Sequence, residues 1–142
     1  LFLAIKMIED QVNPQVEKMM QWLRLCLKNN AKGLQDWCEN IANEGRDGQR
    51  QFLVFGLSLL EHILTYKVSQ QEFPAYNPED WKSIKGLANL LEYSDIEILE
   101  TLFTDHMSFV ERNAHAKILF TALSINISQV LNKKNVEMME MM

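Results

Sequence analysis

Apolar side chains recur at steps of three and four residues from about residue 14 to about residue 131, and this period is typical of amphipathic helices. Six segments follow it: 13–30, 32–43, 46–68, 77–91, 94–110 and 114–131. The strict alternation of a half-buried strand is nearly absent. The sequence therefore predicts an all-α fold, a single bundle of about six helices with short connections.

Polar residues at the segment boundaries predict where these helices begin. Asn-Pro pairs stand at positions 13–14 and 77–78. In each pair the Asn side chain can accept a hydrogen bond from a free backbone N–H, and Pro suits the first helical position. Ser94 and Glu97 fit a capping box, so a helix is expected to start there.

Two glycines carry separate predictions. Gly45 follows the second helical segment, where a left-handed residue commonly closes a helix. Gly56 lies inside the apolar stripe of segment 46–68, the longest of the six. A glycine there costs about 1 kcal/mol relative to alanine, so we expect it to mark a close approach of another helix.

The composition supports one small domain. The chain has 142 residues, 47% hydrophobic, with five glycines and three prolines, which excludes collagen-like and low-complexity classes. We assign 13–132 to a helical domain, 1–12 to a lead-in segment or helix, and 133–142 to a frayed Met-rich tail. The helical opening LFLAIKMIEDQV suggests a piece of a longer polypeptide. No apolar run approaches the length of a membrane span, so no membrane association is expected.

The two cysteines are predicted to be buried free thiols. Cys26 and Cys38 fall on the apolar faces of the first two segments, and a chain of this length does not need a disulfide to fold. This usage favours a cytoplasmic protein.

Motifs for catalysis, cofactors and metals are missing from the sequence. No Gly-rich phosphate loop occurs, and His62, His106 and His115 lack the spacing of paired metal ligands. We therefore expect no catalytic residue, cofactor, metal ion or small-molecule substrate.

One acidic stretch keeps an enzymatic alternative open. Five carboxylates between Glu92 and Asp105 meet no Lys or Arg. Glu97 and Glu100, one turn apart, or His106 could support acid–base chemistry in a small helical enzyme. A solvated or partner-facing acidic surface is the favoured interpretation.

The basic residues are spread thinly over a chain with net charge −5, so direct nucleic-acid binding is not expected. Arg46 and Arg50 lie at a predicted helix start, where the helix dipole disfavours cations. They could serve a partner protein, or form surface ion pairs with Glu39 or Glu44.

Three stretches, read together, resemble a known family. They are QWLRLCLKNN at 21–30, ANEGRDGQRQFLVFGL at 42–57 and FVERNAHAKILFTALSI at 109–125. In order and spacing they are similar to the C-terminal region of the delta-prime subunit of the bacterial DNA polymerase III clamp loader. The match extends with gaps over roughly residues 16–131. His62 and Ala116 depart from the family pattern.

This resemblance implies a collar domain, a non-catalytic helical domain that assembles with the delta and gamma/tau subunits so that the complex can load the sliding clamp in DNA replication. It also implies that the ATPase-type modules lie upstream. From the residues themselves, Arg112 is expected to precede an Asn cap at the last helix. A different helical protein-interaction domain remains the alternative. The residues that match the family motifs, and are candidates for the subunit interface, are Arg24, Gly45, Arg46, Gln49, Phe52, Leu53, Arg112, Asn113 and Lys117.

Overall fold

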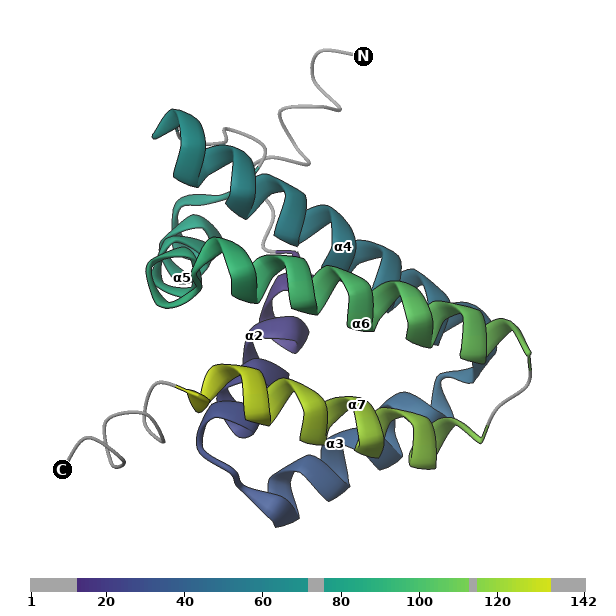
Figure 1. Ribbon diagram of the computed structural model, residues 1–142. Helices are drawn as coiled ribbons and strands as arrows, with labels where there is room; N and C mark the ends of the chain where they lie inside the picture. Colours follow the sequence, from purple (N-terminus) through teal and green to yellow (C-terminus); the bar gives the residue numbers. More distant parts are fainter. Residues whose placement is uncertain (1–12, 72–75, 113–114, 134–142) are drawn as a thin grey trace, which may run out of the picture.

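The computed structural model describes residues 13–71, 76–112 and 115–133, and this part of the chain forms six helices and no strand (Figure 1). The predicted all-α bundle of about six helices is therefore confirmed. The predicted lead-in 1–12 and all of the Met-rich tail after Lys133 lie outside the described residues. The helices are α2 (Pro14–Leu27), α3 (Ala31–Asn43), α4 (Gly45–Ser69), α5 (Pro78–Leu90), α6 (Tyr93–Glu111) and α7 (Ala116–Leu131).

The helices form two neighbouring pairs with α2 between them. The long helices α4 and α6 lie side by side, α3 packs against α7, and α7 also contacts α6. Helix α2 contacts both pairs, and α5 packs against α4 and α2 (Figure 1). This arrangement brings the buried faces of all six helices into one core.

Aromatic side chains occupy the centre of that core. The indole rings of Trp22 and Trp37 are stacked, with centroids 4.6 Å apart and planes 2° from parallel. The rings of Phe52, Phe103 and Phe120 surround Trp22 at 5.6–6.2 Å. Each large apolar side chain removed from water contributes roughly 1.5–3 kcal/mol. Because the five rings come from five different helices, this cluster fixes how those helices meet.

The Asn-Pro helix starts are confirmed. The Asn13 side-chain oxygen accepts a 2.9 Å hydrogen bond from the backbone N–H of Gln15, and that of Asn77 accepts one of 2.8 Å from Asp80. Gly45 has a φ of +83°, the left-handed conformation expected for it, at the joint between α3 and α4.

The predicted capping box at Ser94 and Glu97 is wrong. The box is formed two residues earlier by Glu92 and Asp95, with the Glu92 backbone N–H donating to the Asp95 carboxylate at 3.0 Å. Glu92 and Asp95 are three residues apart, as Ser94 and Glu97 are. Because the earlier pair forms the box, α6 begins at Tyr93.

The close approach expected at Gly56 is confirmed. A Cβ atom added there would lie 2.8 Å from Met19 Cε and 2.8 Å from Phe103 Cε2, and no real Cβ tolerates such distances. Gly56 therefore lets α4 approach α2 and α6 closely.

Within the described part of the chain, α4 alone has the length and apolar composition to cross a membrane. Its buried residues, which include Phe52, Leu59 and Ile63, face the bundle core. Packing against α6 along the bundle accounts for the apolar stripe of this helix.

Candidate functional site

Four of the nine motif residues build the joint between α3 and α4. Gly45 makes the turn, and the Gln49 side-chain amide donates two 3.2 Å hydrogen bonds to the carbonyl oxygens of Ile41 and Ala42. The Ile41 carbonyl also accepts a 3.2 Å bond from the Glu44 backbone N–H, so Gln49 adds a second donor there and supplies one to Ala42 at the end of α3. Phe52 and Leu53 are fully buried. The motif thus has a structural role at the level of the single chain.

The three candidate arginines are instead exposed. Arg24 lies in the last turn of α2, Arg46 in the first turn of α4, and Arg112 directly after α6. The described residues supply no ion pair to any of the three side chains. Exposed guanidinium groups remain able to form paired hydrogen bonds with a carboxylate of another molecule.

The intramolecular partners considered for Arg46 and Arg50 are engaged elsewhere. Glu39 forms an ion pair with Lys117, with Oε1 and Nζ 2.9 Å apart, and Glu44 is paired with Lys18. Arg50 lies 3.9 Å from Asp47 instead. The cost of placing Arg46 at a helix N-terminus is therefore not offset by either of the two glutamates.

The start of α7 differs from the expectation. The N-cap position belongs to His115, which makes no side-chain capping bond, and α7 begins at Ala116. The expected Asn cap is therefore wrong, because His115 occupies the N-cap position of this helix. Asn113 itself lies outside the described residues. The half-buried Lys117, in the first turn of α7, ties this helix to Glu39 of α3.

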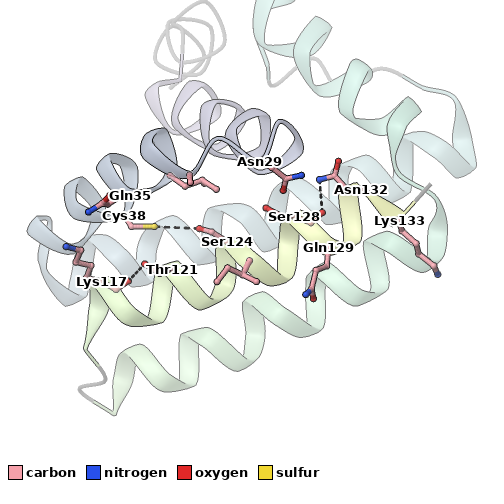
Figure 2. A pocket seen from close by; sticks show the side chains of 13 residues that line it. Asn29, Gln35, Cys38, Lys117, Thr121, Ser124, Ser128, Gln129, Asn132 and Lys133 are labelled. Carbon is pink, nitrogen blue, oxygen red and sulfur yellow. Dashed lines mark hydrogen bonds between the residues drawn. The ribbon is translucent and has the colours of Figure 1, made fainter. Parts of the chain in front are cut away.

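A groove lies between α3 and α7. Its volume is about 880 Å³, and its lining is mostly apolar. Leu34 of α3 and Ile125 of α7 contribute apolar surface, and the buried Cys38, Ser124 and Ser128 also line it (Figure 2). Ile125 is 54% exposed, so this surface is open to solvent.

The charges along the groove are of one sign. Lys117 and Lys133 lie at its two ends (Figure 2), and no carboxylate is among the residues that line it. The 2.9 Å ion pair with Glu39 balances the charge of Lys117 at that end of the groove.

The polar groups of the groove floor are engaged within the protein. Ser124 Oγ accepts a 2.8 Å hydrogen bond from Trp22 Nε1 and donates one of 2.7 Å to the carbonyl oxygen of Phe120. Cys38 Sγ lies 3.6 Å from the same hydroxyl. Through these contacts the polar side chains of the groove floor belong to the core and hold α2, α3 and α7 together.

Both cysteines are buried free thiols, as predicted. Burial raises the pKa of Cys26 from 9.0 to about 12; a hydrogen bond with Ser128 opposes this shift, and Cys38 adds to it. At neutral pH the Cys26 thiol is protonated, and a protonated thiol is a poor nucleophile.

The side chains considered for acid–base chemistry do not line the groove. Glu97 is exposed and Glu100 is half-buried on α6, and neither lines the groove. His106 is buried, and its Nδ1 lies 2.7 Å from the carbonyl oxygen of Leu102, four residues earlier on the same helix. Among the described residues, no group of three or more His, Cys, Asp and Glu side chains could hold a metal ion.

Sequence reasoning missed the groove. The available signal was the spacing of three small polar residues on the last helix, Thr121, Ser124 and Ser128, which places them on one face. Small side chains there, opposite Cys38 on α3, leave space between the two helices.

No protein-family model, curated protein or solved structure matches this chain.

Proposed function

We propose that this chain is a non-catalytic assembly domain of the clamp-loader collar type, which docks with the helical domains of delta and gamma/tau subunits. The observation that carries the proposal is that Arg24, Arg46 and Arg112 are exposed and have no ion pair among the described residues. All three belong to the stretches in which the sequence resembles the delta-prime family.

The joint between α3 and α4 also supports this proposal. Gly45, Gln49, Phe52 and Leu53 form the turn and the core contacts that set where α4 starts. Arg46 follows Gly45 directly, so the same joint that is fixed from inside holds this arginine on the surface. A rigid mount lowers the entropy that a side chain loses on binding.

Exposed apolar side chains provide further contact area. They lie on α4, α5, α6 and α7, where a partner helix could cover them. The large ones are Val54, Val68, Leu90, Tyr93, Ile98, Phe109, Ile118 and Ile125.

Sedimentation velocity with the purified collar domains of delta and gamma/tau tests the proposal. At micromolar concentrations we expect a faster-sedimenting complex that contains this chain, and its amount should depend on both partners. If the chain sediments alone in every mixture, the collar proposal fails. A complex with an unrelated helical protein but not with these subunits would favour a different interaction domain.

A further inference from the structure

The groove between α3 and α7 has the size of a small-ligand site and a mostly apolar lining. Its volume is about 880 Å³, within the range of about 300–1,000 Å³ that is typical of such sites. The half-buried Leu34 of α3 and the exposed Ile125 of α7 supply apolar surface to it. An apolar ligand that enters this space leaves water, and its transfer is favourable.

The polar side chains of the groove floor are already engaged within the protein. Ser124 Oγ accepts a 2.8 Å hydrogen bond from Trp22 Nε1 and lies 3.6 Å from Cys38 Sγ, and Ser128 is hydrogen-bonded to Cys26. An extended peptide would bury backbone N–H and C=O groups against this floor without partners, which is costly. A hydrocarbon chain has no such groups, so the floor favours an alkyl chain over a peptide.

The two ends of the groove differ in charge. At one end, Lys117 Nζ lies 2.9 Å from Glu39 Oε1, and this ion pair carries no net charge. At the other end stands Lys133, which is exposed and has no ion pair among the described residues (Figure 2). The amide side chains of Asn29 and Gln129 line the same end and can donate hydrogen bonds. This end therefore suits a single anionic head group with oxygen acceptors.

We propose that the groove binds a free fatty acid. The alkyl chain lies along the seam between α3 and α7, against Leu34 and Ile125, and the carboxylate lies at the end that holds Lys133, Asn29 and Gln129. Helix α7 has 16 residues and is about 24 Å long at about 1.5 Å per residue, so the seam accommodates an extended chain. The ligand binds without reacting, and its binding does not depend on the collar proposal.

Methyl NMR on the full chain tests the site, with dodecanoate kept below its micelle concentration as the probe. We expect a saturable shift of the Ile125 δ1 methyl signal as dodecanoate is added. Ile118 is the matched control, because it is also an exposed isoleucine of α7 but does not line the groove. Its methyl signal should stay in place.

The charge of the head group is tested separately by calorimetry. Dodecyltrimethylammonium, which has the same alkyl chain and a cationic head, should bind more weakly than dodecanoate. The variant Lys133→Glu should raise the Kd for dodecanoate by roughly fivefold or more, because it replaces an attraction with a repulsion. Lys82→Glu is the control, since Lys82 is an exposed lysine of α5 that does not line the groove. It should leave this Kd nearly unchanged.

Three outcomes would overturn the proposal. One is an Ile125 signal that does not shift with dodecanoate, or that shifts only together with the Ile118 signal. Another is an equal Kd for dodecanoate in the unaltered chain and in Lys133→Glu. The third is a shift that arises only with phosphatidylglycerol vesicles, since a lipid surface and not a free acid would then be the ligand.

Discussion

The indole N–H of Trp22 donates a 2.8 Å hydrogen bond to the hydroxyl of Ser124, a residue 102 positions later in the chain. Both residues are buried, and Ser124 in turn donates to the carbonyl oxygen of Phe120. This pair joins α2 to α7 in the centre of an otherwise apolar core. The bond satisfies the one polar atom of a fully buried tryptophan side chain.

Replacing Ser124 with Ala should therefore destabilise the protein. The Trp22 N–H would lose its acceptor while it stays buried, which costs about 1–3 kcal/mol. Denaturant unfolding followed by tryptophan fluorescence measures the change in the free energy of unfolding. The exposed Ser94→Ala variant is the control, expected within about 0.5 kcal/mol of the unaltered protein. Equal stability of the two variants would show that the hydrogen bond contributes nothing.

Two glycine substitutions should have opposite effects. Gly56→Ala gains helix propensity but forces a methyl group against Phe103 and Met19. Overpacking of about 1–3 kcal/mol then outweighs a gain of about 1 kcal/mol. Gly86→Ala, in α5, meets nothing within 4 Å and should stabilise by up to about 1 kcal/mol. Thermal unfolding of both variants is the measurement, and a rise in melting temperature for Gly56→Ala would contradict the close helix contact.

The joint between α3 and α4 can be tested through Gln49. The variant Gln49→Met keeps the length of the side chain but removes the donor to the carbonyl oxygens of Ile41 and Ala42. The Ile41 carbonyl keeps its bond from the Glu44 backbone N–H, so the variant should lose about 0.5–1.5 kcal/mol, as for an ordinary hydrogen bond. The exposed Gln51→Met, two residues later on α4, should be nearly neutral. Chemical denaturation of the two variants separates these outcomes, and similar losses would argue against the specific role of Gln49.

Stability should fall at alkaline pH because of Cys26. The folded protein holds this thiol protonated up to a pKa of about 12, whereas its usual value is 9.0. Above pH 9 the unfolded chain releases the proton and the folded chain does not, so unfolding becomes more favourable by up to about 1.4 kcal/mol per pH unit. Below pH 9 this contribution stays intact.

Unfolding free energies between pH 7 and pH 10 check this dependence. Cys26→Ala should lower stability at every pH, because it leaves a cavity, but the decline above pH 9 should become shallower. Tyr76 adds a second decline above pH 10, since burial and the nearby Asp80 raise its pKa from 10.0 to about 12. A variant slope equal to that of the unaltered chain would contradict the assignment to Cys26.

Most of the fold could be predicted from the sequence, because helix periods and helix caps are local signals. The starts at Asn13 and Asn77 and the left-handed Gly45 all depend on a few neighbouring residues. The start of α6 was misplaced because Ser94–Glu97 and Glu92–Asp95 offer the same cap spacing. Local chemistry does not decide between them, and the structure selects the second pair.

The surface features were harder to predict because they depend on how distant segments meet. The groove arises where small residues of α7, such as Ser124, face Cys38, which lies 86 residues earlier. The pairing of Lys117 with Glu39 spans 78 residues. No period along the chain contains that information. The stretch containing Gln49 drew attention only through its resemblance to a family, and its structural role became visible only in the three-dimensional contacts.

The most direct test of the account measures, on the same samples, partner affinity and melting temperature for Arg46→Glu and Arg112→Glu. Both arginines are exposed and have no ion pair among the described residues. We predict that each charge reversal raises the Kd for the delta or gamma/tau collar domain by about tenfold or more. A tenfold change corresponds to a loss of about 1.4 kcal/mol of binding free energy. The melting temperature should stay within about 2 °C of the unaltered chain. An unchanged Kd together with a lowered melting temperature would contradict the account, because these arginines would then stabilise the bundle itself.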